Sequence, residues 1–336
     1  MTYSLKIDIY SHVLPEKFKE AFLRSGTLAA TRKERIDALP TLYDMDQRFR
    51  LMDKYEGYVQ VLTLNYPPVE LIGDSKKSVS LAMLANDEMA ELVLKYPDRF
   101  VGAVACLPMD NMDEALKETE RAINDLKCRG VQIFTPTGDR PLDSPEFIPL
   151  YEKMSQYNLP LWLHPKRGKD YADYRTENRS LYDVYHCLGW PYETSVAMTR
   201  FVYSGLLEKY PNLKIITHHC GGMIPYFDRR ILGFQGQEER RLGEEYKARL
   251  TRPVLDYFRM FYNDTALYGS TSGLTCAYEF FGAERLLFGT DTPHDNQLGD
   301  GLIRETINSI ERMDISDSDK KKIFEDNARS LLRLPV

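Results

Sequence analysis

Histidine and carboxylate side chains gather at the ends of short apolar segments in this chain. Four of the six histidines end such segments, and an aspartate ends another. The residues are His12, His164, His218, His219 and Asp291, in the segments 5–12, 159–165, 213–219 and 285–291. Chance placement would scatter histidines over helices and loops as well. Because imidazole nitrogens and carboxylate oxygens bind divalent metals, this clustering predicts a metal site.

The ligand set that we expect is His12, His164 and Asp291. Two nitrogens and one carboxylate oxygen leave a coordination position open, which is typical of a catalytic zinc site and not of a structural one. The same donors would also suit manganese or iron. Zinc is therefore the expected metal, with manganese as the alternative.

The neighbours of these residues leave two questions open. A strand places residues two apart on one face, so Tyr10 shares the face of His12. Tyr10 could bind the metal as a phenolate, donate a hydrogen bond to a metal-bound water, or pack near the site. Adjacent strand residues point in opposite directions, so only one of His218 and His219 is expected inside, and His218 is interpreted as a core residue.

The elements that position these residues follow a regular order. Eight apolar segments read as strands buried on both faces, at 5–12, 58–64, 100–108, 130–136, 159–165, 213–219, 260–267 and 285–291. Helical periodicity separates them, most clearly at 78–100 and 111–130. Eight strand–helix repeats predict an α/β fold, a (β/α)8 TIM barrel whose active site lies at the carboxyl ends of the strands. A doubly wound open sheet is the alternative, but no glycine-rich phosphate loop follows any strand.

Two stretches interrupt this repeat. Residues 13–40 form an insertion after the first strand, and residues 166–190 form a long polar and aromatic loop after the fifth. Loops of this length in a compact domain are usually functional, so we expect the second to close over substrate, with Trp190 among its contacts. Residues 1–336 are expected to form a single domain.

The composition excludes several classes of protein. A net charge of -6 and a pI near 5.7 argue against nucleic-acid binding. No apolar run reaches the roughly 20 residues of a membrane helix, and no signal peptide is visible. The five scattered cysteines indicate neither a disulfide framework nor a zinc knuckle. We therefore expect a cytoplasmic protein.

Segments in a fixed order along the chain carry a family resemblance. They are "KIDIYSHVLPEKF", "RFRLMDKYEGYVQVLTL", "LWLHP", "YPNLKIITHHCGGMIPYFDRRI", "FYNDTALYG", "RLLFGTDTPHD" and "IFEDNARSLLRL". By these segments the chain resembles the amidohydrolase superfamily. Within it, the chain is similar to the branch of aminocarboxymuconate-semialdehyde decarboxylase and related aromatic-acid decarboxylases.

This resemblance implies roles for particular residues. It implies the same three metal ligands, and "HCGGMIP" places the catalytic histidine at His219. Arg230 matches an arginine that reaches the substrate carboxylate of a neighbouring subunit, and Arg48 or Arg50 matches another carboxylate-binding arginine. Tyr10 departs from the pattern, because the family has histidine there and resorcylate-type relatives have glutamate. The site is thus one strong ligand short.

The resemblance implies a homodimeric or larger metal-dependent carboxy-lyase that decarboxylates a small aromatic or muconate-type acid, with His219 and Asp291 as catalytic residues. The metal would act as a Lewis acid, and His219 would deliver a proton to the substrate carbon. The alternative is a metal-dependent hydrolase of a carbon–carbon bond or lactone, or a hydratase. A third interpretation, which Tyr10 favours, is a barrel that has lost its metal and serves as a binding subunit.

Overall fold

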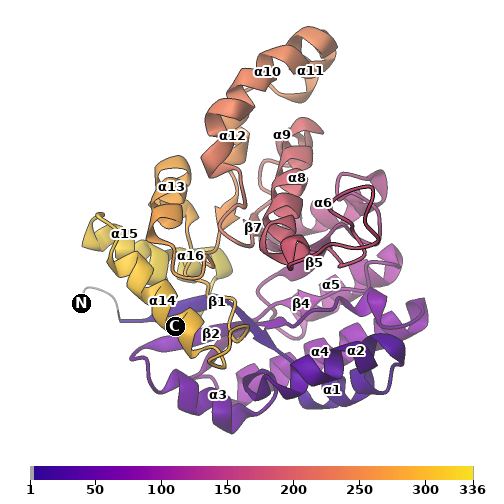
Figure 1. Ribbon diagram of the computed structural model, residues 1–336, viewed down its shortest axis with the longest axis vertical. Coiled ribbons are helices and arrows are strands. Elements are labelled where there is room, and N and C mark those ends of the chain that lie inside the picture. The colour runs from indigo at the N-terminus through magenta and orange to yellow at the C-terminus, as the bar shows by residue number, and fades with distance from the viewer. Residues whose placement is uncertain (1–3, 336) are drawn as a thin grey trace.

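A computed structural model describes residues 4–335, apart from the side chains of residues 27–31. It shows parallel strands enclosed by helices (Figure 1). The strands are β1 (Lys6–Val13), β2 (Tyr58–Leu64), β3 (Phe100–Ala103), β4 (Ala105–Cys106), β5 (Val131–Thr135), β6 (Leu161–Pro165), β7 (Ile215–Thr217) and β8 (Tyr262–Asn263). Every pair of neighbouring strands is parallel, in the orders β1-β2-β3 and β4-β5-β6-β7-β8.

The two sheets join into one barrel. β3 and β4 are halves of one strand, interrupted at Val104, whose N–H donates to the carbonyl of Leu62 on β2. On the other side, residues 286–292 fill the eighth position without forming a continuous strand. The N–H of Leu287 donates to Asn263 on β8, and the N–H of Ile9 on β1 donates to Phe288. The predicted (β/α)8 barrel is therefore confirmed, with an irregular eighth strand.

The helices form the outer layer of the barrel and its extensions. They are α1 (Glu16–Leu23), α2 (Thr27–Asp37), α3 (Met45–Met52), α4 (Ser75–Lys95), α5 (Met112–Asn124), α6 (Ile148–Tyr157), α7 (Val184–Cys187), α8 (Gly189–Tyr203), α9 (Leu206–Lys209), α10 (Asp228–Leu242), α11 (Glu244–Arg249), α12 (Val254–Phe258), α13 (Thr271–Phe281), α14 (Asp300–Glu311), α15 (Asp317–Lys321) and α16 (Asn327–Leu332). Short 3-10 turns lie at 40–42, 69–71, 145–147, 225–227 and 283–285, and a π-helical turn at 322–326. No helix in the described range combines the length and apolar character needed to cross a membrane.

Both predicted long helices are present, with shorter bounds at the carboxyl end. α4 begins after Asp74, whose side chain accepts a hydrogen bond from Lys77 N, and α5 begins after Asn111, which caps Glu114 N in the same way. Instead of reaching Gly130, α5 ends at Asn124 because a turn leads into β5.

The barrel interior is filled by side chains, as the continuous apolar strands require. β2 is buried along its whole length, and β6 likewise. Inside, the indole Nε1 of Trp162 donates to the carbonyl of Ile9. Gly289 is needed for close packing, since a Cβ there would lie 2.9 Å from Asp264 Cβ and 3.3 Å from Tyr10 Cβ.

The two predicted insertions and one further element depart from the simple repeat. Residues 13–40 form α1 and α2, which lie along the β1–β2 side of the barrel (Figure 1). Residues 166–183 contain neither helix nor strand and lead into α7. α10 and α11 project away from the rest of the molecule (Figure 1), and α10 contains no buried residue.

Candidate metal centre and active site

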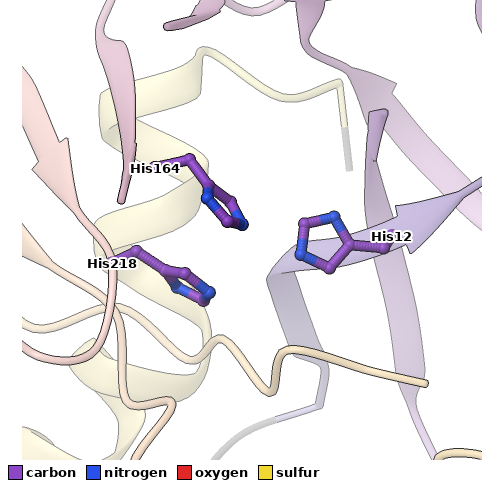
Figure 2. A group of neighbouring side chains, drawn as sticks. All are labelled: His12, His164 and His218. Carbon is purple, nitrogen blue, oxygen red and sulfur yellow. The ribbon is translucent and has the colours of Figure 1, made fainter. Parts of the chain in front are cut away.

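Three imidazoles converge at the carboxyl ends of the barrel strands. His12 on β1, His164 on β6 and His218 after β7 each offer a nitrogen, and these nitrogens lie within 4.8 Å of one another. Figure 2 shows the rings of His164 and His218 pointing toward His12 from the opposite side. All three side chains are buried. Strands that are distant in sequence thus bring metal-type donors to one point.

Asp291 lies at the centre of this group. Its Oδ1 is 3.1 Å from His12 Nε2 and 3.4 Å from His218 Nε2, while its Oδ2 is 3.9 Å from His219 Nε2. Burial alone would raise the pKa of Asp291, but the charge of His218 and the close ring nitrogens of His12, His218 and His219 hold it well below its usual range. The carboxylate is therefore ionised and available as a ligand.

The histidines are oriented by partners on their other ring nitrogens. His12 Nδ1 lies 3.2 Å from Thr63 Oγ1, and His164 Nδ1 lies 2.7 Å from the carbonyl of Pro165. His218 Nδ1 is bonded to the carboxylate of Asp264. Each Nε2 is left free to face the centre. Such partners are typical of metal-binding histidines, because they fix the tautomer and the ring orientation.

Both His218 and His219 lie at this centre, which corrects the prediction that only one of them would. The alternation of side chains applies only to extended backbone, and β7 ends at Thr217. His219 and Cys220 then adopt positive φ angles of 55° each, which turns the chain back on itself. The rings of the two histidines consequently lie 3.8 Å apart, centroid to centroid.

Tyr10 is buried beside the same histidines. Its ring stacks on the imidazole of His218, with a centroid distance of 3.9 Å and an angle of 16° between the planes. Burial, followed by the nearby carboxylates of Asp264 and Asp291, raises the pKa of Tyr10 well above its ordinary value. The side chain is thus a neutral phenol, and its hydroxyl has no hydrogen-bond partner among the described residues.

The two remaining histidines border the centre. His294 is largely buried, with its Nε2 2.8 Å from Asn65 Oδ1 and its ring 5.2 Å from that of His12. Burial lowers the pKa of His294 to about 3, so it is neutral. His186, on α7, packs its ring 4.2 Å from Trp190.

The donor set fits a divalent cation. Burial, and then the neighbouring histidines, lower the pKa of His164 well below its usual range, so its nitrogen is free to bind a metal. Burial also opposes charge on His218, but Asp264 and Asp291 outweigh it and raise the pKa to about 9. The buried Nε2 of His218 has no hydrogen-bond partner among the described residues, and a metal bound here would displace the proton that this ring holds. Buried polar atoms are normally satisfied, so this atom indicates a bound group.

A cavity of about 170 Å³ opens beside His164 and Asp291. Its lining combines cationic and aromatic side chains: Arg32, Arg35, Arg167, Lys169, Tyr66, Tyr185, His186 and Trp190, with Asn65 and His294 at its floor. Arg167 is neutralised by Glu193 at 2.7 Å. Neither Arg32 nor Arg35 forms an ion pair with a described residue. The cavity therefore suits a flat organic anion.

The predicted arginines lie elsewhere, whereas Trp190 lies in the cavity wall. Arg48 is 2% exposed and donates to the carbonyl of His12, so it holds strand β1 and does not face the cavity. Arg50 is exposed near the end of α3. Arg230 lies on the projecting α10, its guanidinium over the ring of Phe234. Trp190 starts α8, with its Nε1 bonded to the carbonyl of Arg167.

Comparison with known proteins agrees with this geometry. A family model described as amidohydrolase matches residues 44–334, most of the barrel.

The chain belongs to the amidohydrolase family. Its relatives in that family include decarboxylases. Gamma-resorcylate decarboxylase of Rhizobium sp. strain MTP-10005 is 33% identical over 305 residues, which cover 86% of this chain and 87% of the relative. The 2-amino-3-carboxymuconate-6-semialdehyde decarboxylase of Dictyostelium discoideum is 26% identical over 351 residues. The match covers 98% of this chain and 92% of the relative. The resemblance to the decarboxylase branch is confirmed.

A solved structure of this amidohydrolase branch matches along nearly the whole chain. It is a dihydroxybenzoic acid decarboxylase of Polaromonas sp. JS666, with bound manganese and the inhibitor 2-nitroresorcinol. The TM-score is 0.79 at 29% sequence identity, and the match covers 98% of this chain and 97% of the other.

Sequence reasoning missed two parts of this amidohydrolase site. The first is α2, whose Arg32 and Arg35 line the cavity; the length of the insertion at 13–40 was the available signal. The second is Asp264, which follows β8 and binds His218. Asp264 lies inside the predicted segment 260–267, so a carboxylate within an apolar strand was the available signal.

Proposed function

We propose that this chain is a metal-dependent decarboxylase of a small aromatic carboxylic acid, and that a hydroxybenzoate is its preferred substrate class. One observation carries the proposal: His12 and His164 lie in one donor group, Asp291 lies beside His12, and His164 and Asp291 line a cavity with aromatic walls and two arginines that form no ion pair with a described residue. The decarboxylase relatives support the same chemistry. They make a hydrolase unnecessary to account for the site.

The metal that we propose is zinc, with manganese as the alternative. Imidazole-rich donor sets favour zinc over manganese at equal availability, although a relative was solved with manganese. His12, His164 and Asp291 would hold the cation. When bound, it would supply a Lewis acid for oxygen atoms of the substrate.

The substrate carboxylate is proposed to bind toward α2. Arg32 lies with its guanidinium 4.2 Å from the centroid of the Tyr66 ring, and Arg35 lies near His294 at the same cavity. A guanidinium matches a carboxylate in shape and charge, so these unpaired arginines suit it better than the buried Arg48. Trp190 and Tyr66, with ring centroids 6.0 Å apart, offer flat faces for the aromatic ring.

The proton is proposed to come from His219. Burial, and then the nearby His218, lower its pKa, so a protonated His219 gives up its proton readily. Asp291 lies 3.9 Å away and can stabilise that proton. In the reaction, the ring carbon that bears the carboxylate takes a proton. The carbon–carbon bond then breaks, its electron pair restores the aromatic ring, and carbon dioxide leaves.

The enzyme is further proposed to be a homodimer or larger homo-oligomer, assembled through the arm of α10 and α11. Arg230 on this arm would reach a neighbouring subunit, as the family resemblance implies. A cytoplasmic location is proposed because all five cysteines are free thiols.

The decisive experiment is to incubate zinc-loaded protein with 2,6-dihydroxybenzoate and related hydroxybenzoates, and to measure carbon dioxide and phenol in equal amounts. Removal of metal with a chelator should abolish turnover, and added zinc or manganese should restore it. The variant His164→Ala serves as the inactive control. A protein that binds no divalent metal would instead support a binding subunit and contradict the proposal.

A further inference from the structure

Tyr10 lies two positions before His12 on strand β1, where the family resemblance implies a further metal ligand. Tyr10 forms no hydrogen bond with any of the three imidazoles or with Asp291, although all are its neighbours. Its ring lies flat against His218 and is fully buried. The ring of Tyr10 therefore packs directly against His218.

We propose that His218 supplies the fourth protein ligand of the metal, so that the ligand missing from β1 comes from the end of β7. The set is then His12, His164, His218 and Asp291. This inference rests on the metal site of the proposed function, and it goes beyond that function by assigning a ligand that the sequence pattern did not provide.

The first argument is convergence. A nitrogen of His218 lies within 4.8 Å of the nitrogens of His12 and His164, and its Nε2 is 3.4 Å from Asp291 Oδ1. This Nε2 is fully buried and has no hydrogen-bond partner among the described residues. Once it loses its proton, this enclosed nitrogen can bind a cation together with the other donors.

The second argument is the support behind the ring. Nδ1 of His218 is bonded to Asp264 Oδ2, and Asp264 Oδ1 accepts hydrogen bonds from Cys220 N at 3.0 Å and Ala266 N at 3.1 Å. A carboxylate that is held by two backbone donors fixes the imidazole with Nε2 pointing inward. Carboxylate–histidine–metal arrangements of this kind are common in metalloproteins.

The third argument is the stacking of the Tyr10 ring on the His218 imidazole. The stacked rings lie 3.9 Å apart, so Tyr10 occupies the space beside His218 and keeps the imidazole from turning away. Gly289 allows this arrangement, since any side chain there would collide with Tyr10 and Asp264. Tyr10, Asp264 and Gly289 therefore act together as positioning residues for one ligand.

The test is to titrate metal-free protein with Co²⁺, and to measure both the dissociation constant and the visible absorption spectrum. Wild-type protein and Tyr10→Phe, which keeps the stacked ring, should bind with equal affinity and give the same spectrum. His218→Ala should bind about 100-fold more weakly and give a changed spectrum, since even supporting residues are worth 10- to 100-fold. Asp264→Asn should weaken binding by a smaller factor.

A rescue experiment separates ligand loss from misfolding. His218→Gly leaves space for free imidazole, and millimolar imidazole should restore Co²⁺ affinity and the wild-type spectrum. The inference would be overturned if His218→Ala bound Co²⁺ with the affinity and spectrum of wild type. It would also be overturned if Tyr10→Phe no longer bound Co²⁺. Wild-type protein that binds no Co²⁺ or Zn²⁺ would refute the proposed function as well, whereas binding lost in His164→Ala but kept in His218→Ala would refute this inference alone.

Discussion

Arg48 illustrates how a single charged residue can serve the site without facing it. Its guanidinium donates to the carbonyls of His12 and Thr41, to Gln60 Oε1 at 2.8 Å and to Ser11 Oγ at 2.5 Å. Burial lowers the pKa of Arg48 to about 10, so the side chain remains charged at neutral pH. The carboxyl end of β1, and with it His12, is held in place by this one side chain.

We therefore predict that Arg48→Met destabilises the protein by roughly 3 to 5 kcal/mol, because it leaves several buried acceptors without donors. Metal affinity should fall as well, since His12 loses its support. Chemical denaturation and Co²⁺ titration would measure both. Arg50→Met, on the exposed face of the same helix, is the matched control and should change stability by only about 0.5 kcal/mol. A raised KM with unchanged stability would instead place Arg48 in contact with substrate.

At the level of residues, the sequence located much of the centre. His12 and His164 were predicted at strand ends and lie in one donor group, and Asp291 lies beside His12, because parallel strands of a barrel bring their carboxyl ends to one rim. That these three residues bind a metal stays a prediction. His218 was misjudged since strand alternation was extended past the last residue of β7. A left-handed backbone at His219 is a local feature that a tertiary packing arrangement selects, and residue spacing does not reveal it.

At the scale of elements, α2 brings two arginines that form no ion pair with a described residue to a cavity whose wall also holds the Asp291 carboxylate. We predict that the double variant Arg32→Gln/Arg35→Gln raises KM for a hydroxybenzoate by about 10- to 100-fold, because a charge-assisted pair contributes more than an ordinary hydrogen bond. The effect on kcat should be smaller. Steady-state kinetics would show this split. Lys33→Gln, on the same helix and paired with Asp37, should behave as wild type. An unchanged KM in the double variant would contradict the assigned role of α2.

The short turn at 69–71 carries Glu70, a half-buried side chain with one buried carboxyl oxygen, and its titration should affect stability. Burial raises the pKa of Glu70 from 4.5 to about 7, and one of its oxygens has no hydrogen-bond partner among the described residues. The folded state therefore holds a proton that the unfolded state releases near pH 4.5. The associated stability is present below pH 4.5 and is lost as the pH rises through 7.

Glu70→Gln should remove this dependence. We compare the unfolding free energy of the variant with that of wild type at each pH. This difference should be about 1 to 3 kcal/mol more favourable to the variant at pH 8 than at pH 4.5. Urea denaturation at the two pH values would measure the difference. Glu279→Gln, at an exposed position, serves as the control. Equal pH profiles for Glu70→Gln and wild type would show that Glu70 titrates normally.

The elements themselves were largely predictable. Continuous apolar runs identified all eight strand positions, and helical periodicity identified α4 and α5. The eighth position was predicted as a strand, yet residues 286–292 bond to their neighbours only intermittently. The insertion at 13–40 folds into helices whose placement over the cavity depends on tertiary contacts, so periodicity could locate it along the chain but not in space.

On the scale of the whole molecule, the projecting arm is the feature that an isolated subunit does not explain. α10 has no buried residue, and its exposed side chains include apolar ones. Phe234 is 48% exposed, and Tyr226, just before the helix, is 77% exposed. Exposed apolar groups gathered on one element mark an interaction surface. That residues 1–336 form one domain, with this arm as part of it, stays a prediction.

We expect the purified protein to be a dimer or larger assembly whose interface includes this arm. Phe234→Asp should weaken self-association by roughly 100-fold, because a charge in an apolar contact is costly. Sedimentation velocity over a range of concentrations would measure this. Leu94→Asp is the control, since Leu94 is 82% exposed but lies on α4, away from the arm. A wild-type monomer at micromolar concentration would contradict the proposed assembly.

The contact between His12 and Asp291 has a consequence for how the protein is made. The first strand supplies one side of the metal centre, and the irregular eighth segment, close to the end of the chain, supplies the other. During synthesis on a ribosome, the N-terminal strand must wait for almost the entire chain before its neighbour emerges. Closing so long a loop is slow, because the entropy is lost before the contact forms. A truncated chain that ends before residue 286 therefore keeps His12, His164 and His218 but lacks Asp291, and it should bind a cation more weakly than the full barrel.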